Sequence, residues 1–210
     1  MNEILEKIAK IRIVPVVAIE KAEDAEKLGE ALIKGGIPCA EVTFRTDAAA
    51  ETIKIMSEKF PEMLVGAGTV LTPEQADRAV AAGAKFCVSP GLNPRVVKHC
   101  VDNGIVMVPG CSSPSDIEAA MEFGLDVVKI FPAEAIGGLP LIKAMSAPYG
   151  NMKFMPTGGI NSGNIVKYLE FKKIIACGGS WMVDKKLISE GRFDEIERLC
   201  KEAVETIKNV

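Results

Sequence analysis

A lysine stands in the middle of an apolar run, DVVKIF at residues 126–131. The β-branched and apolar residues around Lys129 are typical of a buried strand, and lysine is among the residues least often fully buried. An ordinary lysine is less than about 0.1% neutral at pH 7, but desolvation favours the neutral amine. A neutral amine can attack a ketone and form a Schiff base, an electron sink for making or breaking the adjacent carbon–carbon bond. Lys129 is therefore our candidate nucleophile, with a structural buried ion pair as the alternative.

A second polar set lies along the run AEVTFRT at residues 40–46. Because side chains alternate faces along a strand, Glu41, Thr43 and Arg45 share one face, and the other face is apolar. Glu41 could shuttle protons beside Lys129, and Arg45 with Thr69 could hold a substrate carboxylate. The alternative is a structural ion-pair cluster with Lys129. Buried ion pairs stabilise poorly, and groups that converge at strand ends are typical of a site, so we favour the catalytic interpretation.

Two glycine-rich turns, PTGG at 156–159 and GGS at 178–180, follow the last two predicted strands. Glycine lets backbone amides approach a ligand closely, and barrel enzymes commonly bind phosphate at these loops. The alternative is that glycine serves only the tight turns. A third glycine pair, in GAGTVL from Gly66, lacks the final glycine of a dinucleotide-binding motif, so we interpret it as a strand end where side chains must be small.

Short β-rich runs alternate with helical patterns along the whole chain. Thr, Ser, Asp or Asn marks the helix starts, often just before Pro, and Gly marks the ends. The eight predicted strands are 12–19, 39–44, 64–70, 85–90, 105–110, 126–131, 153–157 and 173–178. Eight near-equal units favour a closed α/β fold, a (β/α)8 TIM barrel, over a doubly wound sheet. We expect one domain over 1–210, with short loops and no lid, and an active site at the carboxyl ends of the strands.

Composition excludes several classes of function. The net charge is −3 with 48% hydrophobic residues, so no basic surface indicates nucleic acid or an anionic membrane. No apolar run is long enough for a transmembrane helix, and the first residues resemble a helix start, not a signal peptide. Six cysteines without a C-x-x-C pair indicate buried free thiols in a reducing cytoplasm. With His99 as the single histidine, a zinc site is not expected, and we predict no metal and no cofactor.

Six motifs, taken together and in order, resemble one family: EVTFRT, VGAGTVL, SPGL, VKIFPAE, PTGGI and GGSW. The chain is similar to the 2-keto-3-deoxy-6-phosphogluconate aldolases, which include the 4-hydroxy-2-oxoglutarate aldolases. The resemblance runs from about residue 15 to the last helix. It implies a class I aldolase on a (β/α)8 barrel, usually a homotrimer.

The resemblance also implies a role for individual residues. Lys129 corresponds to the Schiff-base lysine and Glu41 to the proton-transfer glutamate. Arg45 with Thr69 would hold the pyruvyl carboxylate, and Phe131 would lie near the bound pyruvate. The residues that match the phosphate pocket are Gly158, Gly159, Gly179 and Ser180.

The implied reaction is metal-independent cleavage of 2-keto-3-deoxy-6-phosphogluconate to pyruvate and glyceraldehyde 3-phosphate, in the Entner–Doudoroff branch of carbohydrate metabolism. The 6-phosphogalactonate epimer and 4-hydroxy-2-oxoglutarate, which would give pyruvate and glyoxylate, remain open as substrates. An isomerase or synthase of another phosphate-binding barrel would not need Lys129 between Val127 and Phe131. A non-catalytic phosphosugar sensor would not need Glu41 beside Lys129.

Overall fold

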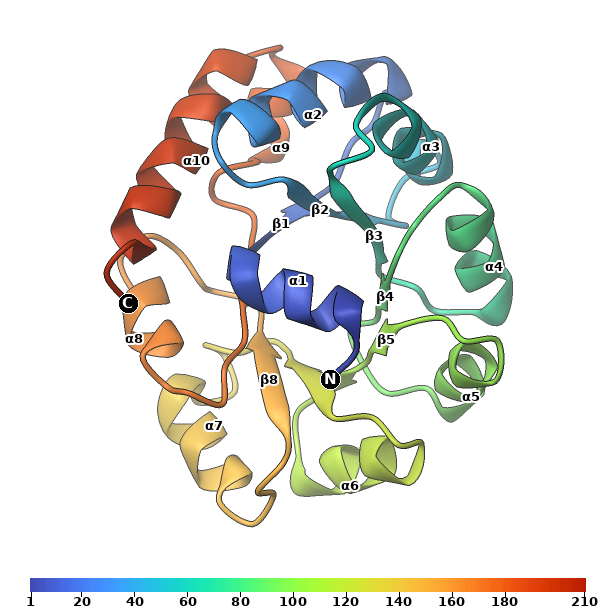
Figure 1. Ribbon diagram of the computed structural model, residues 1–210, viewed down its shortest axis with the longest axis vertical. Coiled ribbons are helices and arrows are strands. Elements are labelled where there is room, and N and C mark those ends of the chain that lie inside the picture. The colour runs from blue at the N-terminus through green and yellow to red at the C-terminus, as the bar shows by residue number, and fades with distance from the viewer.

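Nine short parallel strands, most of them separated by helices, make up the interior of the computed structural model, which describes residues 1–210 (Figure 1). The strands are β1 (Ile13–Val17), β2 (Cys39–Thr43), β3 (Leu64–Gly68), β4 (Cys87–Val88), β5 (Met107–Val108), β6 (Gly110–Cys111), β7 (Val127–Ile130), β8 (Lys153–Pro156) and β9 (Cys177–Gly179). Almost every strand residue is buried, which is the pattern expected where helices cover a parallel sheet. The α/β class is thus as predicted.

The helices are α1 (Glu3–Ile11), α2 (Ala25–Lys34), α3 (Ala49–Lys59), α4 (Pro73–Ala81), α5 (Pro94–Asp102), α6 (Pro114–Glu122), α7 (Gly138–Ser146), α8 (Ile165–Leu169), α9 (Lys185–Ser189) and α10 (Phe193–Ile207), with a 3-10 turn η1 (Ala22–Asp24). All of them except α1 form an outer layer around the strands, and α1 lies across the middle of the view (Figure 1). Side chains of Thr72, Asn93 and Ser113 cap α4, α5 and α6 just before a proline, so the predicted start signals are confirmed there. None of the helices combines the length and apolar character needed to cross a bilayer.

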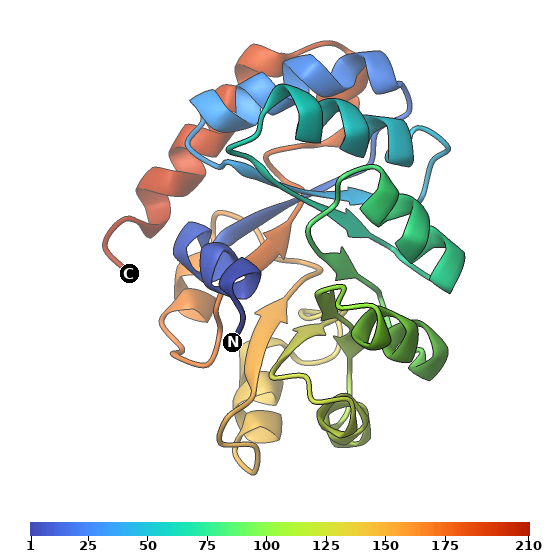
Figure 2. The same ribbon diagram turned by 45° about the vertical axis from the view of Figure 1, so that its right-hand side comes forward.

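The prediction of a closed (β/α)8 TIM barrel is wrong. The strands form a six-stranded half-barrel in the order β5-β4-β3-β2-β1-β9 and a separate three-stranded sheet in the order β6-β7-β8. In Figure 2 the yellow and orange strands of the small sheet lie below the blue-to-green strands of the half-barrel.

Pro109 explains one of the two breaks between the sheets. It divides the predicted strand 105–110 into β5, which pairs with β4, and β6, which pairs with β7. Pro109 accepts a hydrogen bond from the Lys129 backbone N–H at 2.9 Å, but a proline has no N–H to donate to a ladder. At the other break, two isolated bridges, Thr157↔Gly178 and Phe154↔Ile174, replace a ladder between β8 and β9.

The two sheets nevertheless share one interior. Glu41 of β2, in the half-barrel, meets Lys129 of β7, in the small sheet. Because the strands within each sheet are parallel, their carboxyl ends lie at one edge of that sheet. The loops after β2, β3, β7, β8 and β9 can therefore contribute to a common site even though the ladders do not close.

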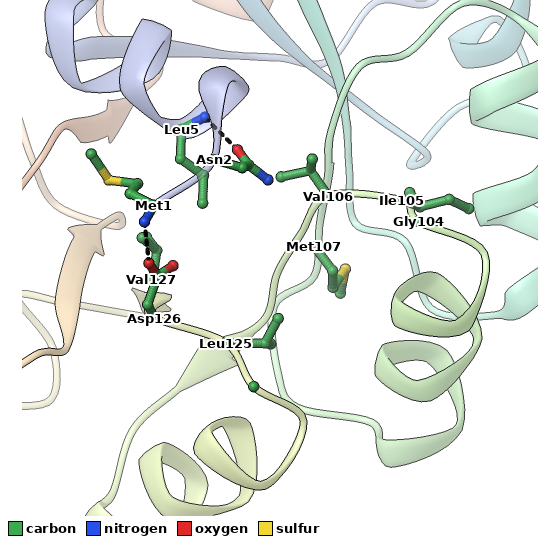
Figure 3. Close-up of a pocket in the computed structure, with 11 residues that line it drawn as sticks. Met1, Asn2, Leu5, Gly104, Ile105, Val106, Met107, Leu125, Asp126 and Val127 are labelled. Carbon is green, nitrogen blue, oxygen red and sulfur yellow. Dashed lines mark hydrogen bonds and ion pairs between the residues drawn. The ribbon is translucent and has the colours of Figure 1, made fainter.

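Helix α1 lies at the other end of the strands and borders a cavity of about 330 Å³ (Figure 3). The α-amino group of Met1 pairs with Asp126 at 2.8 Å, and the Asn2 side chain accepts a hydrogen bond from the Leu5 backbone N–H. The remaining walls come from the segments that lead into β5 and β7 and from the first residue of each strand. None of the predicted site residues lines this cavity.

The single histidine lies on α5, partly exposed, and gives a pH-dependent test of stability. His99 Nε2 lies 2.7 Å from Asp77 Oδ1, and this hydrogen bond raises the pKa of His99 above its ordinary value of 6.5. The stabilisation is therefore fully present below the unfolded pKa and is lost as pH rises through the folded pKa. Asp77→Asn should lower the urea midpoint at about pH 5.5 and have no effect near pH 9. A loss of equal size at both pH values would contradict this account.

Candidate active site

A buried ion pair joins the two sheets at the centre of the molecule. Lys129 Nζ lies 3.4 Å from Glu41 Oε1, and the two side chains are only 4% and 1% exposed. The Lys129 amine also lies 5.2 Å from the centre of the Phe131 ring. Glu41 Oε2 is buried and has no hydrogen-bond partner. Because an unpartnered buried carboxylate oxygen is costly, its presence indicates a group kept free to accept a proton or a hydrogen bond.

Glycine on the neighbouring strand makes room for the Glu41 carboxylate. In the pairing of β2 with β3, Glu41 lies opposite Gly66 and Thr43 opposite Gly68. A Cβ at Gly68 would lie 2.3 Å from Glu41 Oε1, and one at Gly66 would lie 2.3 Å from the Phe86 ring. The prediction that side chains must be small in this strand is confirmed.

Gly68→Ala should therefore displace the Glu41 carboxylate. Since Glu41 is almost fully buried, the new methyl group overpacks the core, and we expect a loss of about 1–3 kcal/mol in the free energy of unfolding. If Glu41 acts on a proton beside Lys129, as the sequence predicts, turnover should fall as well, because the carboxylate moves away from the amine. Gly150→Ala is the matched control, because its Cβ would meet no atom within 4 Å. Urea unfolding and turnover that are the same in both variants would show that the close approach is unimportant.

Arg45 stands further along the chain after β2 and points toward the end of β3. Its Nε donates a hydrogen bond to Thr69 Oγ1 at 3.1 Å. Thr69 has a φ of +53°, which is uncommon for a β-branched residue and costs backbone energy. Arg45 and Thr69, the two residues predicted to hold a carboxylate, are thus hydrogen-bonded to each other, and the strained turn directs the threonine hydroxyl to the guanidinium.

A cavity of about 410 Å³ opens at the carboxyl ends of the strands and gathers most of the predicted binding residues. The predicted residues that line it are Arg45, Phe131, Gly158, Gly159, Gly179 and Ser180. Thr69, Lys129 and Glu41 are not among its walls. Lys129 and Glu41 lie behind Phe131, which lines the cavity and lies beside the Lys129 amine. The geometry thus places a buried amine and carboxylate behind a cavity with an arginine and two glycine turns.

Sequence reasoning missed other residues of this cavity, of which Thr157, Asp184 and Lys185 are polar. Thr157 Oγ1 is buried without a partner. Its position at the end of β8, inside PTGG, was a usable signal. No comparable sequence signal marks Asp184 and Lys185, because only the turn after β9 brings them to the cavity wall.

The six cysteines lie in the core and are all unpaired. Burial raises the pKa of Cys111 and of Cys200 to about 12. Thiols of this kind are largely protonated at neutral pH and are poor nucleophiles. No group of three or more His, Cys, Asp or Glu side chains is arranged to hold a metal ion.

Comparison with known proteins assigns this arrangement to a family. The family model for KDPG and KHG aldolases matches residues 4–199. The chain belongs to the KDPG and KHG aldolase family. It is 48% identical to a 2-dehydro-3-deoxy-phosphogluconate aldolase of Treponema pallidum, over 99% of both chains. It is 40% identical to the KHG/KDPG aldolase of Escherichia coli, over 93% of this chain and 92% of that protein.

Solved structures of the family resemble the chain closely. The KDPG aldolase of Legionella pneumophila, with pyruvate captured at low pH as a covalent carbinolamine intermediate, superposes with a TM-score of 0.92. The two share 39% identity over 96% of this chain and 98% of that one. Membership of the aldolase family, which the six sequence motifs indicated, is therefore confirmed.

Proposed function

We propose that this protein is a class I aldolase that cleaves 2-keto-3-deoxy-6-phosphogluconate to pyruvate and glyceraldehyde 3-phosphate. The observation that carries the proposal is the buried Lys129–Glu41 pair behind a cavity with the Arg45 guanidinium. A covalent amine nucleophile needs burial and an adjacent base, and this pair supplies both. The curated relatives with this activity support the same substrate.

Each step has a group available for it. Lys129 attacks the C2 ketone to give a carbinolamine, and loss of water gives the protonated imine. Glu41 takes the proton of the C4 hydroxyl, the C3–C4 bond breaks, and its electrons move to the imine nitrogen as an enamine. The aldehyde leaves, the enamine is protonated at C3, and water releases pyruvate and the free amine. The free Oε2 of Glu41 allows one carboxylate to accept the hydroxyl proton while Oε1 stays near Lys129.

The substrate would lie across the cavity. The carboxylate of the keto acid would meet Arg45, whose Nε is already held by Thr69. The phosphate would lie at the opposite wall, against the backbone of Gly158, Gly159 and Gly179 and the hydroxyl of Ser180. Phe131, between these walls and Lys129, would contact the pyruvyl part of the substrate.

Removing the Ser180 hydroxyl separates the phosphate site from the reacting centre. Ser180→Ala should lower kcat/KM for the phosphorylated substrate by roughly 10- to 150-fold, the effect of one hydrogen bond to a charged group. Cleavage of 4-hydroxy-2-oxoglutarate should change little, because it has no phosphate. Arg45→Ala should weaken both reactions, since both substrates carry the 2-keto carboxylate. Equal losses on the two substrates in Ser180→Ala would mean that the phosphate binds elsewhere.

A substrate panel tests the function directly. Pyruvate release should be measured from 2-keto-3-deoxy-6-phosphogluconate, its 6-phosphogalactonate epimer and 4-hydroxy-2-oxoglutarate, with and without EDTA. We expect cleavage of the first substrate and no effect of the chelator. No pyruvate from any of the three, or loss of cleavage in EDTA, would overturn the proposal.

Cleavage of 4-hydroxy-2-oxoglutarate is a second candidate activity. The Escherichia coli relative is a KHG/KDPG aldolase, and the carboxylate-binding group Arg45 serves both substrates equally well. We further propose one aldolase domain over 1–210, a homotrimer, and a cytoplasmic location. The trimer rests on the family resemblance, and the location is supported by six unpaired cysteines, which are typical of a reducing compartment.

A further inference from the structure

Lys185, the first residue of α9, lines the cavity together with the two glycine turns. The Val183 backbone N–H donates to the Ser180 carbonyl at 3.0 Å, so the chain turns directly after Ser180 and returns Lys185 to the cavity. We infer that Lys185 is a phosphate ligand of this cavity and that Glu20 competes with the phosphate for its ammonium group. This inference rests on the proposed function, because it assigns a further residue to the phosphate end of that substrate.

The charges around the cavity support a cation at this end. The ionisable residues that line it are Arg45, Asp184 and Lys185. Arg45 is held by Thr69 at the end of β3, and the Asp184 carboxylate accepts a hydrogen bond from the Lys186 backbone N–H at 2.8 Å. Backbone amides and a serine hydroxyl carry no net charge, whereas a phosphate ester carries about −1.5 to −2. Lys185 is therefore the cationic side chain available beside the glycine turns.

The Lys185 side chain pairs with a glutamate in the structure. Its Nζ lies 2.5 Å from Glu20 Oε1, in the loop after β1, and the two side chains are 62% and 54% exposed. Exposed pairs of this kind are weak. A flexible lysine with three donor hydrogens can exchange such a carboxylate for a phosphate dianion at little cost.

Lys185 also lies between two neighbouring cavities. Together with Ala18 it lines the site cavity and a smaller cavity of about 70 Å³ that Glu20 and Asp24 border. Its side chain is thus within reach of the acidic pair on one side and of the phosphate end on the other. Removing the lysine charge would also leave Glu20 without this partner.

The test compares Lys185→Met with Lys186→Met. Methionine keeps an unbranched side chain between the two cavities and removes the charge. Lys186 is the matched control, because it is the next residue, is 78% exposed, and pairs with Glu190 outside the cavity. A hydrogen bond to a charged group strengthens binding roughly 10- to 150-fold. Competition from Glu20 for the ammonium group reduces this gain. We therefore expect Lys185→Met to raise KM for the phosphorylated substrate about 5- to 20-fold, with little change in kcat. Lys186→Met should match the wild type.

Glu20→Gln distinguishes a ligand from a structural tether. If Lys185 binds phosphate, releasing it from Glu20 should lower KM for the phosphorylated substrate or leave it unchanged. If the pair only fastens α9 to the loop after β1, Glu20→Gln should raise KM as much as Lys185→Met does, and this outcome would overturn the inference. Equal KM values in Lys185→Met and Lys186→Met, or an equal loss on 4-hydroxy-2-oxoglutarate, would overturn it as well.

Titration with inorganic phosphate separates this inference from the proposed function. Calorimetry on the wild type and Lys185→Met requires no turnover, and the variant should bind phosphate about 5- to 20-fold more weakly. If the wild type releases no pyruvate, the aldolase proposal fails, while weaker phosphate binding in the variant would still support Lys185 as a ligand. Equal phosphate affinity in the two proteins would reject Lys185 whatever the activity.

Discussion

Lys129→Met should lower turnover by about 10⁴- to 10⁶-fold, the loss expected when the nucleophile of a covalent mechanism is removed. Methionine keeps an unbranched chain in β7 but cannot form an imine. Steady-state release of pyruvate measures the loss. Lys153→Met is the control, because Lys153 begins the adjacent strand β8 and pairs in register with Val127. Turnover of Lys129→Met within tenfold of the wild type, by the same measurement, would contradict a Schiff-base mechanism.

The same substitution leaves the buried Glu41 carboxylate without its cation. Breaking a buried pair by removing one partner costs about 3–5 kcal/mol, so Lys129→Met should also unfold at lower urea concentration. Adding Glu41→Gln removes the unpaired charge and should restore part of the lost stability but none of the activity. This double variant separates loss of chemistry from loss of folding.

Glu41→Gln should lower turnover by roughly 10²- to 10⁴-fold, the typical contribution of a general acid–base group. The amide keeps the size of the side chain and can still accept a hydrogen bond from Lys129, but it cannot take the C4 hydroxyl proton. Imine formation with pyruvate should survive in slow form, because it requires no carbon–carbon bond cleavage and no C4 hydroxyl proton to be removed. Steady-state turnover and the rate of borohydride inactivation in pyruvate measure the two steps. Turnover near that of the wild type would remove Glu41 from the mechanism.

Alternation along single strands was enough to predict that Lys129 and Glu41 lie side by side in the interior. A lone lysine in an apolar run, and a glutamate on the polar face of another strand, identified Lys129 and Glu41, and the structure brings them within 3.4 Å. The glycine turns were equally visible, because PTGG and GGS end consecutive predicted strands. Each of these features is local, so the sequence records it directly.

Features that depend on several segments were not predicted. The prediction of a closed sheet was wrong because Pro109 interrupts one ladder, and because only isolated bridges link β8 with β9. Eight regular units indicate how many strands exist but not whether neighbouring hydrogen bonds continue around the ring. Lys185 was missed because its contact with the cavity depends on the turn after Ser180 and on Glu20, which is far away in the sequence.

The central claim is that Lys129 forms an imine with the keto acid. Incubation with pyruvate and borohydride, followed by peptide mapping with mass spectrometry, tests it most directly. We expect a reduced pyruvyl adduct on Lys129, no adduct when Lys129 is replaced by methionine, and normal labelling of the Lys153→Met control. An adduct on a different lysine, or no adduct in a preparation that still cleaves 2-keto-3-deoxy-6-phosphogluconate, would contradict it.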